Sequence, residues 1–306
     1  MIFKKNVLLA PHTTFKIGGK AQYFVAAKTK EDVLSALLHA KKLNIPFFVL
    51  GGGSNLLVSD KGFKGLVLKI ENCKLKISNR IVYAEAGVSF PWLVRETAKR
   101  GLAGLEWAGG LPGTVGGAVR GNAGAFGGET KDSVVYVDCI DQRGRIRKLS
   151  KRQCQFSYRS SIFKKRNWIV LGAAFAFKKG NAKELRSIAK NHITYRKDRN
   201  PLEFPNAGSI FKNCDLNEVP KKFRDFVKPA VKIDPFPVVP TAFLISQAGL
   251  KGLRVGKAEV SRKHPNFLIN IGNAKAKDVK GLIAKVKRAI KKKFGIDLEE
   301  EVQYLE

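Results

Sequence analysis

The stretch GGLPGTVGGAVRGNAGAFGGE, residues 109–129, constrains the fold more than any other feature of the chain. Nine of its 21 residues are glycine, and only Arg120 and Glu129 are charged. Glycine inside a helix or strand costs about 0.5–1 kcal/mol relative to alanine, so this density needs a reason. The tract is either a flexible linker or a surface where backbone closely approaches a large ligand.

The apolar residues of the tract argue against a linker. Leu111, Val115, Val119 and Phe126 recur at intervals, and Pro112 stiffens the chain. Flexible linkers are dominated by serine and other polar residues and lack such a rhythm. The pattern therefore favours a ligand surface.

A second glycine run, Gly51-Gly52-Gly53-Ser54-Asn55, directly follows an apolar strand. Consecutive glycines allow several backbone N–H groups to converge on an anion, and the serine and asparagine would add side-chain hydrogen bonds. For this run alone, an ordinary flexible turn explains the sequence equally well. Neither GxGxxG nor GxxxxGK[ST] is present, which excludes the simple dinucleotide and P-loop motifs. Two glycine-rich walls suggest a long ligand with a pyrophosphate and a flat ring system.

Strands and helices alternate along the first two thirds of the chain. We expect strands at 20–27, 46–50, 65–70, 74–78, 80–87 and 168–178, a hairpin over 134–149, and helices at 31–44, 89–100 and 182–198. Beyond a boundary near 196–206 we expect a strand at 208–213, an irregular proline-punctuated insertion over 214–240, a helix at 241–248, strands near 254–261 and 267–271, a basic helix and a last strand at 298–305. A length of 306 residues suffices for two or three compact units.

The charge is strongly basic, with 57 lysines and arginines against 25 acidic residues and a formal net charge of +32. Such an excess favours anionic partners, either nucleic acid or a phosphorylated small molecule, unless it reflects a generally basic proteome. The densest run, 275–293, places Val279, Leu282, Ile283, Val286 and Ile290 on one helical face, which predicts that its lysines are solvated. We expect no specific nucleic-acid partner.

The four cysteines, Cys73, Cys139, Cys154 and Cys214, are scattered, without a CxxC pair or a histidine at ligand spacing. We therefore expect no metal site and buried free thiols in a reducing cytoplasm. The apolar runs are too short to span a bilayer, and the N-terminus lacks the pattern of a signal peptide. These features predict a cytoplasmic protein without a membrane partner.

Nine motifs in order identify a resemblance. TTFKIGG (13–19), LGGGSNLLV (50–58), PGTVGGAV (112–119), NAGAFGGE (122–129), YRSSIFK (158–164), NAGSIFKN (206–213), AGLKG (248–252), HPNFLIN (264–270) and LEEEV (298–302) resemble the UDP-N-acetylenolpyruvoylglucosamine reductase family of flavoenzymes. The resemblance implies an α+β fold: an FAD-binding domain of the vanillyl-alcohol-oxidase (PCMH) type in two α+β subdomains, 1–70 and 71–198, and a C-terminal α+β substrate domain, 199–306, whose last strand is a candidate to return to the first subdomain.

The resemblance also implies the reaction. NADPH reduces non-covalently bound FAD, which then reduces the enolpyruvyl group of a UDP-sugar to give UDP-N-acetylmuramate for peptidoglycan. Hydride addition to the β-carbon of an enol ether bearing a carboxylate leaves negative charge on the α-carbon and carboxylate, which requires a cation and a proton donor. Arg159 would bind the carboxylate, Ser209 would protonate the α-carbon, and Glu301 would hydrogen-bond the carboxylate region.

From composition alone, each of these residues has a plainer explanation. A loop arginine is usually a surface ion pair, a serine after Ala-Gly a turn hydroxyl, and an acidic triplet a solvated edge. Only their place in family motifs favours catalysis. Glu299 and Glu300 compete for the acidic role, and the position before Val302 selects Glu301.

The other implied site residues fall mostly in the two glycine-rich segments. The expected FAD contacts are Gly51, Gly52, Gly53, Ser54, Asn55, Pro112, Gly113, Thr114, Gly116, Gly117, Asn122, Ala125 and Arg196. The expected contacts with the UDP-sugar are Tyr158, Arg199, Asn213 and Gln247, with Arg199 replacing a lysine of the family as the cation for the diphosphate. We expect a monomer.

Some positions depart from the family pattern. His12 replaces an asparagine, Gly121 replaces a methionine, Arg120 is unexpected, and the 214–240 insertion is longer than in compact members. A tyrosine-bearing loop that covers the diphosphate in one subfamily is missing, so the chain resembles the other subfamily. The alternatives are another flavin oxidase or dehydrogenase of the same cofactor fold, a nucleic-acid-binding protein, and a member that binds FAD without turnover.

Overall fold

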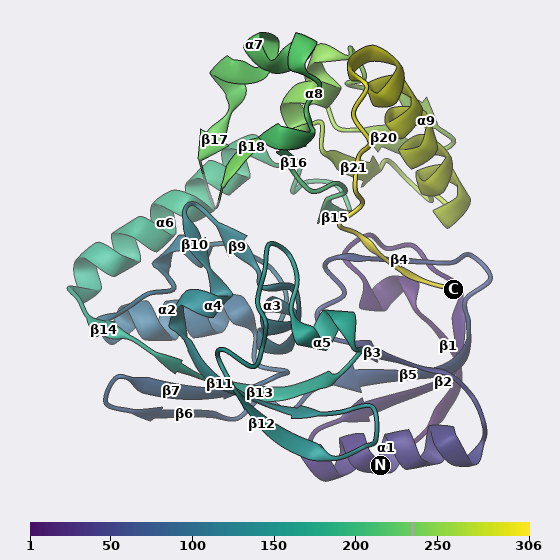
Figure 1. The fold of residues 1–306 in the computed structure, drawn as a ribbon. Coiled ribbons are helices and arrows are strands. Elements are labelled where there is room, and N and C mark those ends of the chain that lie inside the picture. Colours follow the sequence, from purple (N-terminus) through teal and green to yellow (C-terminus); the bar gives the residue numbers. More distant parts are fainter. Residues whose placement is uncertain (234–235) are drawn as a thin grey trace. The chain divides into compact units, whose positions relative to one another are not determined.

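The computed structural model describes residues 1–233 and 236–306, and the chain forms two compact units that are each discontinuous in sequence (Figure 1). The first unit consists of residues 1–7, 21–52 and 64–196. The second consists of residues 8–20, 53–63 and 197–306. The three-part division expected from the sequence stays a prediction.

The first unit contains a four-stranded sheet and a five-stranded sheet. The four-stranded sheet has the order β1 (Lys4–Leu8), β2 (Lys20–Ala27), β5 (Phe63–Ile70), β3 (Phe47–Leu50), with β3 and β5 parallel. Helix α1 (Lys30–Lys42) lies along this sheet (Figure 1) and buries Val33, Ala36 and Ala40 in the same core as the strands. A capping box between Thr29 and Asp32 fixes where α1 begins, because each side chain bonds the other residue's amide.

The five-stranded sheet has the order β12-β11-β13-β7-β6, and all its neighbours are antiparallel. Its strands are β6 (Leu75–Ser78), β7 (Ile81–Glu85), β11 (Val134–Ile140), β12 (Ile146–Ser150) and β13 (Ile169–Ala176). The pairing of β11 with β12 confirms the expected hairpin. Helix α3 (Val115–Gly121), formed by the middle of the glycine tract, packs on β13 and β7, so the tract contains a helix that its glycine content did not predict.

Short elements complete this unit. They are α2 (Phe90–Lys99), β8 (Leu102–Ala103), β9 (Gly124–Ala125), β10 (Gly128–Glu129), α4 (Thr130–Ser133), α5 (Ile162–Lys165), β14 (Lys178–Lys179) and α6 (Ala182–Arg199), whose last residues belong to the second unit. Figure 1 shows α2, α3 and α4 on the same side of the five-stranded sheet.

The second unit is built on the antiparallel sheet β15 (Asn206–Ser209), β21 (Phe267–Asn270), β20 (Ala258–Val260), β19 (Arg254–Val255). Helix α9 (Ala276–Phe294) packs on β20 and β19. The five apolar residues expected on its inner face are all buried, while Lys277, Lys280 and Lys285 are exposed, which confirms the solvated-face interpretation.

The C-terminal strand β22 (Gln303–Leu305) pairs in parallel with β4 (Leu56–Val58). Most expected elements agree with the observed bounds to within two residues at each end, but two strands differ by more. The last strand covers 303–305 rather than 298–305, and the strand expected at 208–213 is β15, which begins at Asn206 and ends at Ser209. Strand β1 was not foreseen.

The insertion is more regular than expected. It contains a three-stranded sheet of β16 (Cys214–Asp215), β18 (Pro237–Val239) and β17 (Lys232–Ile233), besides helix α7 (Arg224–Val227), and it leads into α8 (Thr241–Gln247). Phe226 stacks on Phe294 of α9, with ring centroids 5.8 Å apart. Asp234 and Pro235, which belong to the expected insertion, lie outside the described residues.

All four cysteines are free, as expected, but Cys73 is exposed, contrary to the expectation of burial. Burial raises the pKa of Cys139 and of Cys154 to about 12, so both thiols are protonated at neutral pH. Among residues 1–233 and 236–306, no helix has the length and apolar character needed to cross a bilayer. The same residues contain no cluster of His, Cys, Asp and Glu that could hold a metal ion.

Candidate active site

The two glycine runs of the first unit lie against each other. A Cβ on Gly52 would lie 2.8 Å from Gly113 Cα, and a Cβ on Gly51 would lie 2.8 Å from the Thr114 hydroxyl. Real Cβ atoms do not approach other atoms so closely, so only glycine allows this backbone contact. The structure brings these four residues together, and their contact with FAD stays a prediction.

Most glycines of the tract make room for the protein itself rather than for a ligand. A Cβ on Gly116 would lie 2.9 Å from that of Ala86, and Cβ atoms on Gly109 and Gly128 would collide with the Ala189 carbonyl and the Trp107 ring. This corrects the interpretation that the glycines chiefly clear space for a cofactor. By contrast, a Cβ on Gly121 would have nothing within 4 Å, and one on Gly117 would have only the Thr114 hydroxyl, at 3.7 Å.

Helix α3 begins in the glycine tract, and its first amides are already bonded. Val115 N donates to Val88 O and Gly116 N donates to Ala86 O, both at 2.9 Å, while the Thr114 hydroxyl accepts from Gly117 N at 3.4 Å. The Gly116 amide is therefore not a free donor for an anion. Exposed Pro112 directly precedes this turn, and Ala125 pairs with Gly128 in the small β9–β10 ribbon.

Asn122 ends α3 and supports the loop that carries Arg159. Its backbone is left-handed (φ 43°), and its fully buried side chain donates to Ser157 O at 3.1 Å and accepts from Lys131 N at 3.0 Å. Both ends of this amide are therefore bonded within the protein, and these bonds support the turn after α3; the expected cofactor contact of Asn122 stays a prediction.

Arg159 lies in a tight turn in which Ser157 and Ser160 bond each other twice through their backbones at 3.0 Å. Its φ of 53° is unusual for a residue with a side chain, and such strain concentrates at functional sites. The guanidinium lies 4.8 Å from the centre of the Tyr158 ring and donates to Gly124 O at 2.7 Å. The turn therefore connects both predicted residues to the glycine tract.

Arg196 is held by the tract as well. Its Nε donates to Gly109 O at 3.0 Å, and its guanidinium lies 5.2 Å from the centre of the Phe126 ring. Phe126 in turn stacks on His192, with ring centroids 4.0 Å apart. Burial, together with the charge of Arg159, lowers the pKa of Arg196, and its Nη2 is buried without a hydrogen-bond partner.

In the second unit, Thr14 joins the first glycine loop to the strand that carries Ser209. Its backbone N donates to Gly53 O at 3.1 Å, its hydroxyl donates to Asn206 O at 2.7 Å, and Asn206 N returns a bond to Thr14 O at 3.2 Å. Gly208, in the left-handed region (φ 77°), leaves open space directly before Ser209.

Asn55 and Glu301 meet in the same unit. Asn55 Nδ2 donates to Glu301 O at 3.0 Å, and Glu301 N donates to the carbonyl of Ile210, the residue after Ser209, at 2.7 Å. The structure thus brings Ser209, Glu301 and Asn55 together around one short backbone segment. The Oδ1 of Asn55 is buried without a partner, and Ser54 beside it is partly buried.

The two competing glutamates are engaged elsewhere. Glu299 forms an ion pair with Lys212. Glu300 accepts hydrogen bonds from Lys287 at 2.7 Å and from the Tyr304 hydroxyl. Burial acts to raise the pKa of Glu300, but these bonds hold that pKa below its ordinary value.

The remaining predicted substrate residues occupy three positions in the second unit. Arg199 is exposed at the end of α6, Asn213 Oδ1 accepts from Thr241 N at 3.3 Å at the start of α8, and exposed Gln247 ends that helix. The Gln247 carbonyl accepts from Lys293 Nζ at 2.6 Å.

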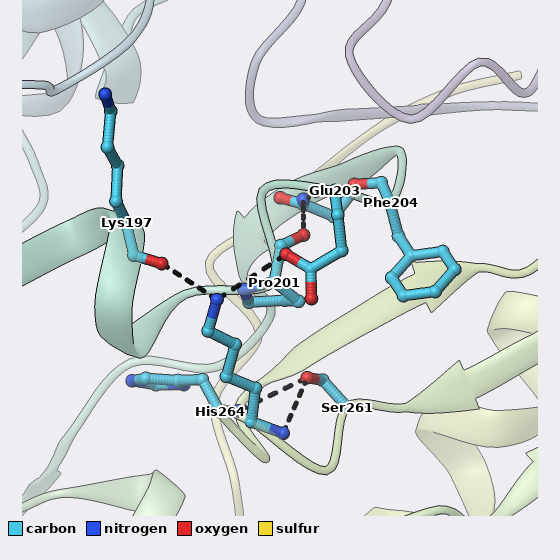
Figure 2. A network of polar contacts seen from close by, with 8 residues as sticks. Lys197, Pro201, Glu203, Phe204, Ser261 and His264 are labelled. Atoms are coloured by element: carbon cyan, nitrogen blue, oxygen red, sulfur yellow. Dashed lines mark hydrogen bonds and ion pairs between the residues drawn. The ribbon is translucent and has the colours of Figure 1, made fainter.

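A polar network lies beyond the end of α6. Lys263 Nζ donates to Lys197 O at 2.8 Å and lies 3.6 Å from a Glu203 oxygen, while Ser261 Oγ accepts from the amides of Lys263 and His264, each at 3.2 Å (Figure 2). Burial lowers the pKa of His264 to about 4, and its Nδ1 has no hydrogen-bond partner.

Sequence reasoning singled out neither Thr14 nor Asn266 individually, although both lie in quoted motifs. The signal that could have found Asn266 is a polar side chain inside an otherwise apolar segment, PNFLI, since a buried amide must find partners. The stacking of Phe126 on His192 had no local signal because the two residues are 66 positions apart.

Comparison with known proteins identifies one enzyme family. Residues 21–150 match the family model of an FAD binding domain, and residues 200–305 match that of the UDP-N-acetylenolpyruvoylglucosamine reductase C-terminal domain. The chain is 40% identical over 301 residues to the UDP-N-acetylenolpyruvoylglucosamine reductase of Clostridium novyi, covering 98% of this chain and 91% of the relative.

Two further matches cover nearly the whole chain. The reductase of Caldanaerobacter subterraneus is 38% identical over 299 residues, covering 97% of this chain and 92% of the relative. The crystal structure of the enzyme (MurB) from Thermus caldophilus is 30% identical and superposes with a TM-score of 0.78, covering 100% of both chains. The chain belongs to the UDP-N-acetylenolpyruvoylglucosamine reductase family.

Proposed function

We propose that the chain is an FAD-containing, NADPH-dependent oxidoreductase. It reduces the enolpyruvyl group of UDP-N-acetyl-3-O-(1-carboxyvinyl)-glucosamine to UDP-N-acetylmuramate in peptidoglycan precursor synthesis. The observation that carries this proposal is the 40% identity, over almost the entire chain, to the UDP-N-acetylenolpyruvoylglucosamine reductase of Clostridium novyi.

The residues present fit FAD. Two side-chain-free backbone segments meet at Gly52 and Gly113, a Cβ on Gly117 would meet only the Thr114 hydroxyl at 3.7 Å, and Arg196 has a buried guanidinium nitrogen without a partner. An unpaired buried polar group is costly unless a ligand satisfies it, so Arg196 suits a polar cofactor. The residues that would hold the group are Gly51, Gly52, Gly53, Ser54, Asn55, Gly113, Thr114, Gly117 and Arg196.

When bound, FAD supplies a two-electron carrier between NADPH and the substrate double bond. The chain's own residues act on the charge that develops on the substrate. Arg159 offers a planar fork of donors to the carboxylate, which lysine cannot reproduce. Ser209 Oγ gives its proton to the α-carbon, and Glu301 hydrogen-bonds the carboxylate region, so that charge is neutralised as it forms. Tyr158, Arg199, Asn213 and Gln247 bind the UDP-sugar.

The proposal is tested with purified protein. We expect a visible flavin absorbance that NADPH bleaches and that the enolpyruvyl sugar restores under anaerobic conditions. A protein that stays colourless after incubation with FAD contradicts the proposal. Bleaching by NADPH without recovery on addition of the enolpyruvyl sugar, but with recovery on another acceptor, would favour a different flavin dehydrogenase.

We also propose that the protein is a cytoplasmic monomer. Its strong positive charge opposes self-association by repulsion between copies, an effect that salt screens. Light scattering at low and high salt tests the oligomeric state, and a dimer at low salt contradicts it. Fractionation of cells tests the location.

A further inference from the structure

We propose that Asn266 is a positioning residue that holds Ser209 and Glu301 in one arrangement, through the main chain of Ile210 and Phe211. The inference rests on the roles proposed above for Ser209 and Glu301. It concerns contacts within the second unit only, and it assigns to Asn266 a part in the reaction without contact with the substrate.

The ladder between β15 and β21 ends at the pair Ser209 and Phe267. Asn266 continues it by one residue. Its carbonyl accepts from Ile210 N at 2.8 Å, its Nδ2 donates to Phe211 O at 2.8 Å, and its Oδ1 accepts from Phe211 N at 3.0 Å. The side chain of Asn266 thus stands in for a strand neighbour directly after Ser209.

The opposite side of the same segment holds the C-terminal residues. Ile210 O accepts from Glu301 N at 2.7 Å, and Lys212 N donates to Glu299 O at 2.9 Å. Residues 210–212 therefore lie between Asn266 and the segment 299–302. A displacement of this strip would move the proton donor on one side and the carboxylate on the other.

The residues that form these hydrogen bonds are buried. Asn266 is 3% exposed, Phe211 1% and Ile210 0%. Because water cannot replace the lost partner, truncation of Asn266 leaves an amide and a carbonyl of Phe211 unpaired, and the strip must shift to satisfy them. A displacement of about 1 Å at a reacting group can cost about 100-fold in rate.

Asn270 provides a matched control. It is a buried asparagine of the same unit, four residues further on, and its side chain makes three bonds: Nδ2 donates to Phe15 O at 3.2 Å, and Oδ1 accepts from Gly272 N and Ala274 N at 3.0 Å. These bonds involve neither 209–212 nor 299–302. Replacement of Asn270 therefore reports the general cost of losing a buried amide.

The test compares Asn266→Ala with Asn270→Ala as holoenzymes, at a temperature well below both thermal midpoints. We expect similar losses of thermal midpoint, unchanged flavin content and an unchanged rate of flavin bleaching by NADPH. Reoxidation by the enolpyruvyl sugar should be slower by about 10- to 100-fold in Asn266→Ala alone. The loss should lie in kcat with little change in KM, as expected for groups that act in the transition state.

Equal reoxidation rates in the two variants overturn the inference. If Asn266→Ala does not fold, Asn266→Asp replaces it, because Asp keeps an acceptor for Phe211 N and puts a carboxyl oxygen in place of the donor to Phe211 O. Ser209→Ala and Glu301→Gln test the proposed roles of Ser209 and Glu301 separately from the role of Asn266. If these variants reoxidise at the parent rate, the proposed roles fail; if they are slow while Asn266→Ala matches Asn270→Ala, only the role of Asn266 fails.

Discussion

The side-chain amide of Asn55 donates a hydrogen bond to the main-chain carbonyl of Glu301 at 3.0 Å, although the two residues lie 246 positions apart. Asn55 belongs to the glycine loop expected to bind the cofactor, and Glu301 is the proposed carboxylate of the substrate step. One side chain therefore belongs to both halves of the proposed chemistry.

Replacing Asn55 with alanine should impair cofactor retention and substrate reduction together. A partly buried hydrogen bond contributes about 0.5–1.5 kcal/mol, so we expect a several-fold loss in flavin affinity and in reoxidation rate. Flavin absorbance after gel filtration and stopped-flow reoxidation measure the two effects. Retention of the parent values in both measurements would refute the link.

Ser209→Ala should separate the two half-reactions. Because the hydroxyl is proposed to protonate only the substrate, NADPH should still bleach the flavin at the parent rate. Reoxidation by the enolpyruvyl sugar should fall by about 10²–10⁴-fold, the usual contribution of a general acid. Stopped-flow absorbance measures both steps, and reoxidation at the parent rate would show that another group donates the proton.

Arg159→Lys should keep the positive charge and lose the planar pair of guanidinium donors. Lysine offers a compact ammonium in place of the planar pair of donors, so we expect at least tenfold slower substrate reduction, equal to about 1.4 kcal/mol. Arg152→Lys, an exposed position in the preceding segment, serves as the control. Steady-state kinetics checks both, and equal kinetics in the two variants would argue against a bidentate role.

Asp60→Ala should destabilise the second unit. The Asp60 carboxylate accepts from Ala276 N at 2.8 Å and from Lys277 N at 3.1 Å, at the first turn of α9. Loss of such a cap costs about 1 kcal/mol, which lowers the midpoint by about 1–2 °C in a protein of 306 residues. Calorimetry compares it with Lys61→Ala, whose exposed side chain should leave the midpoint unchanged.

His264 should make stability pH-dependent. Burial lowers its folded pKa to about 4, against about 6.5 in the unfolded chain, because it outweighs a backbone hydrogen bond that acts to raise the pKa; the charge of Lys232 adds a smaller lowering. The unfolded state therefore binds more protons between these values, so stability is intact above pH ~6.5 and falls as pH drops toward ~4, by up to about 3 kcal/mol. Denaturant titrations should show a flatter profile for His264→Gln; an unchanged profile assigns the effect to other groups.

The sequence was most informative where apolar residues recur with the spacing of a helix or a strand. The apolar stripe of α9 and the hairpin of β11 and β12 followed from spacing alone, because burial on one face leaves a readable pattern. Helix α3 escaped prediction because its glycines disfavour a helix locally. Packing against β13 and β7, and amides bonded to Ala86 and Val88, outweigh that propensity.

For the candidate site, too, the sequence predicted some features and not others. Motifs pointed to Ser209, Glu301 and the glycine runs, and contacts within the second unit join Ser209 to Glu301 through Ile210. Residue spacing did not predict that the amide of Gly116 is already bonded, or that the side chain of Asn122 donates to Ser157 O and accepts from Lys131 N. Such assignments depend on where distant backbone groups lie, which residue spacing does not encode.

The pairing of β22 with β4 has a practical consequence for anyone who cuts or recombines this gene product. A fragment that starts at residue 197 lacks β4 and Asp60, and with them the neighbour of its own last strand and the cap of its longest helix. A transplantable module must therefore bring residues 8–20 and 53–63 along with the C-terminal third. Chimeras joined at a single crossover near 196 should accumulate as insoluble protein, whereas exchanges at all of these borders should stay folded.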